Sequence, residues 1–136
     1  MSFENNFFKI NFDKSNSLLT IIAKNDLPLV DEEFDDLVKS LDVFYQGCEK
    51  NKVKFKMWFD LRNLGLLDKK YYLKLIDFFK ENEIISQNFL IGTIVLSNNN
   101  IINGVINKFL YFYDNKRPIK ITNNEEEGVK FLSEQK

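Results

Sequence analysis

The residues best equipped for chemistry lie in one stretch, MWFDLRNLGLLDKKYY, which runs from Met57 to Tyr72. Its two aspartates could hold Mg²⁺ or Ca²⁺, or share a proton as an acid–base pair. Its lysines, at the expected start of a helix, could bind a phosphate or an acidic group of a partner. The candidate binding residues of this stretch are Asp60, Arg62, Asn63, Asp68, Lys69 and Lys70.

Each candidate also has a purely structural explanation. Asp60 can end a strand, Asp68 can cap a helix, and the lysines can form an ordinary solvated surface. The stretch holds no serine, cysteine or histidine and no glycine-rich loop. We therefore predict no catalytic residue, no metal ligand and no cofactor. One further hypothesis is a carboxylate–metal enzyme around Asp60 and Asp68. No general base or nucleophile accompanies these two carboxylates, which counts against it.

The composition removes several classes of enzyme. The chain has 136 residues, no histidine and a single cysteine, Cys48. Without histidine there is no Ser-His-Asp or Cys-His catalysis and no histidine-ligated zinc or haem. Cys48 can form no disulfide within the chain, which fits a reducing compartment. The neighbouring Glu49 is expected to raise the pKa of its thiol and make it a poor nucleophile.

The charges favour neither nucleic acid nor a membrane as a partner. The chain carries 19 basic and 20 acidic residues, a net charge of −1, and its only arginines are Arg62 and Arg117. Arginine is preferred for bidentate contacts to phosphates and bases, so we do not expect nucleic-acid binding. No apolar run approaches the length of a membrane span, and the first residues are polar, so we expect a cytoplasmic protein.

Hydrophobic periodicity predicts alternating strands and helices. Residues 7–12 and 18–23 form a hairpin, and Pro118 places the last strand at a sheet edge. We expect the first helix to end at Gly47, and Thr122 and Glu125 to form a capping box. The expected strands are 7–12, 18–23, 52–60, 89–96 and 117–122; the expected helices begin near Asp31, after Asp68, at 97–100 and after Thr122, the last burying Val129 and Leu132.

This β-β-α-β-α-β-α-β-α order predicts a single α/β domain over residues 1–136. Strands that alternate with helices after an opening hairpin imply right-handed parallel crossovers. The run 89–96 is apolar on both faces, as an interior strand of a parallel sheet is. We therefore expect a mixed, mostly parallel sheet of about five strands with helices packed on it.

The helix that begins at 97–100 is apolar over more than half of its circumference, whereas a half-buried helix needs only one apolar stripe. Either it is buried on two sides within the domain, or its excess face meets a partner. Its end, FLYFY, is rich in aromatic residues that can anchor an interface. We therefore add Phe109, Phe112 and Tyr113 to the candidate binding residues. A phenylalanine-rich core could also enclose an apolar ligand.

Three local patterns give the chain a resemblance to the STAS-like family, which includes bacterial anti-sigma-factor antagonists. They are the opening hairpin, the FDL motif of residues 59–61 that leads to Asp68 before a helix, and the closing run 116–132, in which an Arg-Pro pair precedes a short strand and an acidic capped helix. In antagonists that switch, a phosphorylatable Ser or Thr directly follows that Asp. Here the matching positions are Lys69 and Lys70.

The resemblance therefore implies a binding scaffold without the phosphorylation switch. Our main hypothesis is a noncatalytic protein-interaction or regulatory module of STAS-like type, with a protein partner or a second copy of the chain. The alternative is binding of a small apolar or anionic, lipid-like ligand within or beside the sheet.

Overall fold

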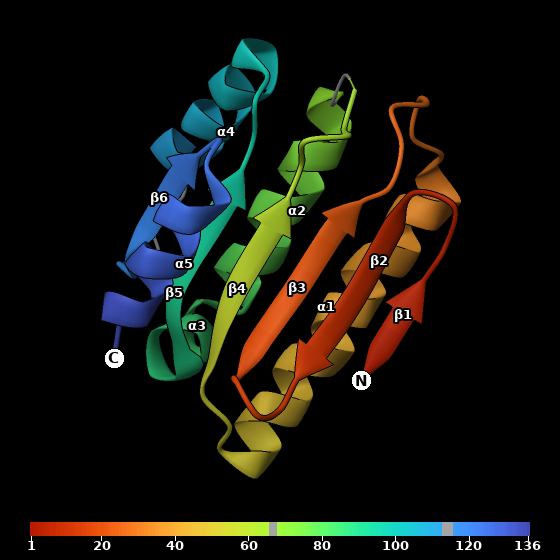
Figure 1. The fold of residues 1–136 in the computed structure, drawn as a ribbon. Helices are drawn as coiled ribbons and strands as arrows, with labels where there is room; N and C mark the ends of the chain where they lie inside the picture. Colours follow the sequence, from red (N-terminus) through yellow and green to blue (C-terminus); the bar gives the residue numbers. More distant parts are fainter. Residues whose placement is uncertain (66–67, 113–115) are drawn as a thin grey trace.

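The fold is built on one six-stranded mixed sheet, whose strands follow one another in chain order from β1 to β6 (Figure 1). The computed structural model describes residues 1–65, 68–112 and 116–136, with Phe112 described for its backbone alone. β1 and β2 run antiparallel, as do β2 and β3, and the remaining junctions are parallel. The strands are β1 (Ser2–Glu4), β2 (Phe8–Asp13), β3 (Leu18–Ala23), β4 (Phe55–Asp60), β5 (Leu90–Leu96) and β6 (Ile119–Thr122).

Helices cover the two faces of this sheet unequally. Figure 1 shows α1, α2 and α4 on one face and α5 on the other, where it lies over β5 and β6. A layer on each face is the usual arrangement for parallel strands, which are apolar on both sides. The helices are α1 (Asp31–Asn51), α2 (Lys69–Glu81), the short α3 (Glu83–Phe89), α4 (Asn100–Phe112) and α5 (Glu125–Glu134).

The predicted α/β class and the mixed, mostly parallel sheet are confirmed, and the sheet has six strands where about five were predicted. The sixth strand is β1, whose three residues are too few to give a periodic signal. Phe3 pairs with Ile10, so the hairpin partner β2 and not the local sequence holds β1 in place. α3 was not expected either, and the observed order is β-β-β-α-β-α-α-β-α-β-α.

Two predicted helix ends are also wrong. α1 continues through Gly47 to Asn51, because Cys48 beyond the glycine is buried and its burial outweighs the low helix propensity of glycine. α5 begins after Asn124, whose side chain accepts a hydrogen bond from the backbone N–H of Glu127 at 3.1 Å. Thr122 is not the cap; its hydroxyl donates to the Glu127 carboxylate. Val129, expected in the core, is exposed.

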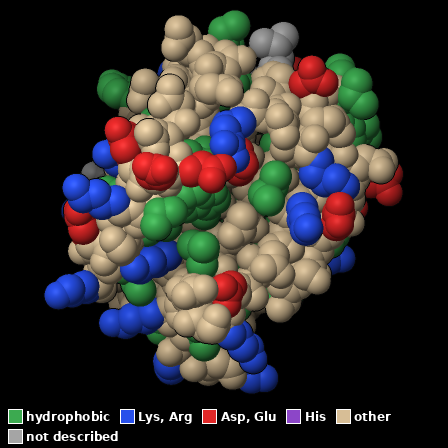
Figure 2. All heavy atoms as spheres, in the orientation of Figure 1, with side chains coloured by type: hydrophobic (Ala, Val, Ile, Leu, Met, Phe, Trp, Pro, Cys, Tyr) green, Lys and Arg blue, Asp and Glu red, His purple; other side chains and the backbone are tan. Residues whose placement is uncertain are grey.

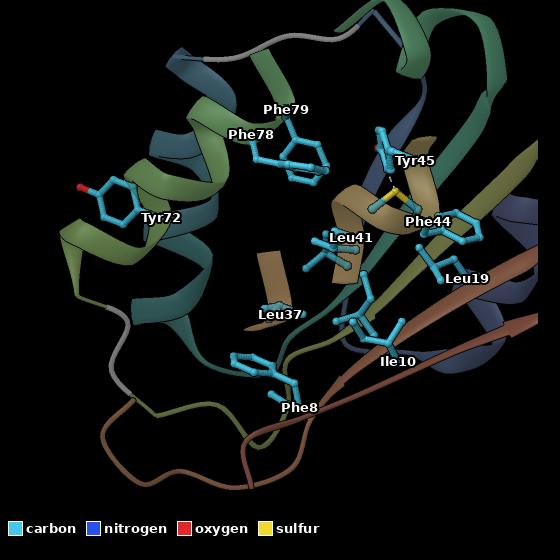
Figure 3. Close-up of a cluster of buried hydrophobic side chains, with 14 of the residues drawn as sticks. Phe8, Ile10, Leu19, Leu37, Leu41, Phe44, Tyr45, Tyr72, Phe78 and Phe79 are labelled. Atoms are coloured by element: carbon cyan, nitrogen blue, oxygen red, sulfur yellow. Dashed lines mark hydrogen bonds between the residues drawn. The ribbon is translucent and has the colours of Figure 1, made fainter. Parts of the chain in front are cut away.

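The main core lies between the sheet and the helices α1 to α4 and is rich in aromatic rings (Figure 3). Tyr45 of α1 is fully buried, with its ring centroid 5.2 Å from that of Phe78 and 5.4 Å from that of Phe55. Its hydroxyl lies 3.2 Å from Oγ of Ser86 and 3.6 Å from Sδ of Met57. The hydroxyl therefore keeps polar contacts inside an apolar core, where an unpaired one would be costly.

α5 lies very close to the opposite face of the sheet, at Gly128. A Cβ atom at this position would be 2.9 Å from Cη2 of Trp58 and 3.3 Å from Cγ2 of Ile94. From the same face of β4, Lys56 donates a hydrogen bond of 2.5 Å to the carbonyl of Leu132, near the carboxyl end of α5, where a cation is favourable. Glycine at 128 therefore sets the distance between α5 and β4.

We expect Gly128→Ala to destabilise the protein by roughly 1–2 kcal/mol, although alanine is the better helix former by about 1 kcal/mol. The indole ring of Trp58 is too rigid to give way cheaply to the added methyl group. Gly47→Ala and Gly104→Ala are the matched controls, because a Cβ at either helical position meets nothing within 4 Å. Both controls should gain stability in urea denaturation. A Gly128→Ala protein as stable as the controls would contradict the close packing.

Candidate functional site

The polar residues predicted to do chemistry lie where the parallel strands end, at the upper edge of the sheet in Figure 1. Asp60 is the last residue of β4, and the loop that follows it leads to α2. This loop is held to the sheet, since Leu61 N–H donates to the carbonyl of Leu96 at 2.9 Å and Leu64 is buried. The position matches the expectation for an α/β sheet, in which such edges carry the binding residues.

Arg62 joins two carboxylates from distant parts of the chain. Its Nε donates to Asp60 Oδ1 at 3.0 Å and its Nη2 to Asp60 Oδ2 at 2.7 Å, a bidentate pair. The same Nη2 lies 2.6 Å from Oε1 of Glu125, at the start of α5. The Arg62 guanidinium hydrogen-bonds to the Asp60 carboxylate and so lowers the pKa of that carboxyl. Arg62 thus fixes the loop after β4 to the first turn of α5.

The start of α2 forms a second, separate group. Asp68 accepts a hydrogen bond from Lys70 N–H at 3.1 Å, which confirms the predicted cap. The Nζ of Lys70 lies 2.9 Å from Asp31 Oδ1, and the Tyr71 hydroxyl donates to the same oxygen at 2.7 Å. The ammonium of Lys70, followed by the Tyr71 hydroxyl, lowers the pKa of Asp31. α2 is thereby tied to the first turn of α1.

Two of the three cations of the predicted anion site are engaged in ion pairs within the chain. Arg62 contacts Asp60 and Glu125, and Lys70 contacts Asp31, so neither side chain presents an unopposed charge. Lys69 is exposed, as is Asn63. The two aspartates of the metal hypothesis have different partners, a guanidinium for Asp60 and a backbone N–H for Asp68. Across the described residues, no three His, Cys, Asp or Glu side chains are grouped to hold a metal ion.

Cys48 is unsuited to nucleophilic chemistry. It is 3% exposed, and burial raises the pKa of its thiol to about 11. The sequence pointed to Glu49 as the cause, whereas desolvation is the cause in the structure. We expect the folded protein to be alkylated by iodoacetamide at pH 8 at least about 100-fold more slowly than the urea-unfolded protein. Equal rates in a timed mass-spectrometric assay would contradict this burial.

The apolar surplus of α4 is mostly internal. Ile102 and Ile106 are buried, and the ring of Phe109 is half-buried, with its centroid 5.9 Å from that of Phe79 on α2. Ile101 and Tyr111 remain exposed, at 61% and 85%. Two other predicted binding residues, Tyr113 and the side chain of Phe112, lie outside the described residues. Phe109 is thus placed inside the fold and not on a flat outer surface.

Beside Phe109 is an apolar pocket of about 120 Å³, between α2 and α4 and above the helix-covered face of β4, β5 and β6. Its floor is formed by sheet residues and its walls by the two helices. Figure 3 shows Tyr72, one of the wall residues, extending from α2 away from the Phe8–Tyr45 side of the core. The residues that line it are Met57, Phe59, Leu61, Tyr72, Leu75, Phe79, Leu90, Thr93, Val95, Val105, Ile106, Phe109, Leu110 and Ile119.

Sequence reasoning missed two residues that matter at these sites. Glu125 was assigned to a capping box, and nothing in the linear sequence indicates its contact with Arg62. Thr93 read as one more position of an apolar strand, yet it is a polar residue on the pocket floor. Both depend on contacts between segments far apart in the chain, so no local pattern could have revealed them.

No helix within the described part of the chain is long and apolar enough to cross a lipid bilayer. Comparisons with protein-family models, with curated proteins and with solved structures gave no match. Two features remain from which a function can be inferred: the edge of the sheet where the parallel strands end, called the carboxyl edge below, and the apolar pocket.

Proposed function

We propose that this chain is a noncatalytic interaction or regulatory module of STAS-like type. The strand order supports the proposal, since an antiparallel opening is followed by three parallel junctions in chain order. The last helix lies on the face opposite the others, as Figure 1 shows. These features support a scaffold for binding of the kind that the resemblance implies.

The observation that carries the proposal is that the charged side chains of Asp60 and Arg62, at the carboxyl edge, are held in ion pairs within the chain. Asp60 is held by a bidentate contact to Arg62, and its lowered pKa makes it a weak base. Arg62 in turn is shared with Glu125. These groups stabilise the loops and provide an ordered, charged surface, not a reactive constellation.

The start of α2 supports the same conclusion. Lys69 is the residue that follows the capping Asp68, at the position where switching relatives of the STAS-like type carry a hydroxyl. An ammonium group cannot accept a phosphoryl group in the way that Ser or Thr does. A module without this switch would bind its partner constitutively, through exposed residues of the edge such as Asn63 and Lys69.

Site-specific photo-crosslinking tests this proposal. A benzophenone amino acid replaces either Asn63 or Lys69 at the carboxyl edge. The matched control carries the same amino acid in place of Lys54, which is exposed just before β4, at the opposite end of that strand. We expect the two edge positions to give one discrete adduct, with a protein partner in cells or with a second copy in the purified protein. Adducts that form equally well from position 54, or none from either edge position, would overturn the proposal.

A further inference from the structure

We propose that the pocket between α2 and α4 binds a small, neutral, mainly apolar molecule with one hydrogen-bonding group, which Thr93 receives. The ligand class is that of a single aromatic ring with a hydroxyl substituent. This site is separate from the protein-binding edge, and its occupant does not depend on the STAS-like assignment.

The size and the lining of the pocket define the apolar part of the ligand. A cavity of about 150 Å³ lined by Leu, Ile and Phe side chains stays dry and binds benzene. This pocket, of about 120 Å³, has a lining of the same kind. Among the described residues that line it, none carries a charge, so an ionised carboxylate or phosphate would lose its hydration without compensation. The ligand is therefore neutral.

A bulge in β5 brings Thr93 to the pocket. Phe55 of β4 pairs with Leu90, but Met57, two residues on, pairs with Thr93, so the register shifts at Ile91 and Gly92. In a regular strand, residues 90 and 93 would point to opposite faces. Because of the bulge, both line the same pocket. Bulges of this kind re-aim side chains and recur beside binding sites.

The Thr93 hydroxyl is available to a ligand. Thr93 is only 6% exposed, and its backbone N–H bonds to the carbonyl of Pro118. Among the hydrogen bonds of the described residues, none joins its hydroxyl to another protein group. Among the described residues, Thr93 Oγ1 is not one of the fully buried side-chain atoms without a partner, so the hydroxyl keeps some contact with water and can exchange that water for a ligand group. Among the described sheet residues that line the pocket, Thr93 is also the one with a polar side chain.

The pocket can be reached from solvent. Phe59, although it belongs to an interior strand, is only partly buried, as are Leu110 and Val105 on α4. Ile119 on the edge strand β6 is 39% exposed. These partly exposed lining residues mark an opening beside α4, so entry does not require the core to unfold.

Chemical-shift titration of the ¹⁵N-labelled protein with phenol and with benzene tests the proposal. Thr93→Val removes the hydroxyl and keeps the shape of the side chain, and valine suits a strand. We expect both probes to shift amides of pocket residues in the wild type. In Thr93→Val, the affinity for phenol should fall about 3–10-fold, the value of one hydrogen bond, while that for benzene stays within twofold.

Two further variants separate pocket binding from surface binding. Val105→Phe places a ring into the pocket from α4 and should abolish the shifts, while Val129→Phe adds the same ring at an exposed position of α5 and should leave them unchanged. Thr93→Val should also melt at the wild-type temperature or above it, since no internal hydrogen bond is lost. If neither probe shifts pocket amides, or if Thr93→Val weakens both probes equally, the proposal fails.

Discussion

Replacing Gly65 by alanine should destabilise this protein by about 2–3 kcal/mol, the largest effect that we expect from a single methyl group. Gly65 lies in the loop after β4, and a Cβ atom there would be 2.6 Å from the carbonyl oxygen of Asp26 and 3.4 Å from its carbonyl carbon. The obstacle is backbone, so no side-chain rotation can relieve it. The loop cannot simply retreat either, since Leu61 and Leu64 hold it to the sheet and the core.

Urea denaturation at pH 7 measures this effect. Gly47→Ala is the control, because it replaces a glycine by alanine at a position where the added Cβ meets no other atom within 4 Å. The backbone at Gly65 does not have a positive φ, so the expected loss comes from the contact with Asp26 and not from conformational strain. A Gly65→Ala protein that is as stable as the wild type would mean that the loops after β3 and β4 do not touch in solution.

Arg62→Ala should cost about 2 kcal/mol, between the values for exposed and fully buried ion pairs. The substitution leaves the Asp60 carboxylate, whose side chain is only 16% exposed, without its bidentate partner. Arg62→Lys should recover only part of this loss, because an ammonium group cannot make the two parallel hydrogen bonds. Glu125→Gln is the control, since Glu125 is 57% exposed and should matter by less than about 0.5 kcal/mol.

The cost of Arg62→Ala should depend on pH in a defined direction. The Asp60 pKa is lowered in the folded protein, so the carboxylate stabilises the fold above the ordinary aspartate pKa, near 4, and this contribution is lost as the pH falls below it. The gap in unfolding free energy between wild type and variant should therefore be full at pH 6 and shrink towards pH 3. A gap that is constant over this range would show that packing, and not charge, is lost.

The two sites share one loop, because Leu61 lines the pocket and lies between Asp60 and Arg62. Variants of the edge should therefore be examined for ligand binding as well as for stability. Figure 2 shows the face of the sheet on which α5 lies, and charged side chains are visible on this face. The pocket lies on the opposite face, under α2 and α4. Thr93 lines the pocket, whereas Asn63 and Lys69 do not, so variants at these positions separate ligand binding from protein binding.

Local sequence determined the α/β class, the boundaries of β3, the interior place of β5 and the cap of α2 at Asp68. Each depends on a signal that lies within a few residues: a short β-rich run after a polar turn for β3, an apolar run for β5, and an aspartate before the first helical turn of α2. β1 was missed because three residues carry no period, and α1 ran past Gly47 because the buried Cys48 outweighs helix propensity.

Tertiary structure alone decided which charged residues pair at the carboxyl edge and where the pocket forms. The sequence places Asp60, Arg62 and the lysines of α2 near one edge, but the ion pairs of Arg62 with Glu125 and of Lys70 with Asp31 join segments that are distant in the chain. The pocket depends likewise on the spacing of α2 and α4 above the sheet and on the bulge that turns Thr93 towards it. Side-chain type and period are local properties, whereas pairing and empty volume are relations between segments, and only the folded chain fixes those.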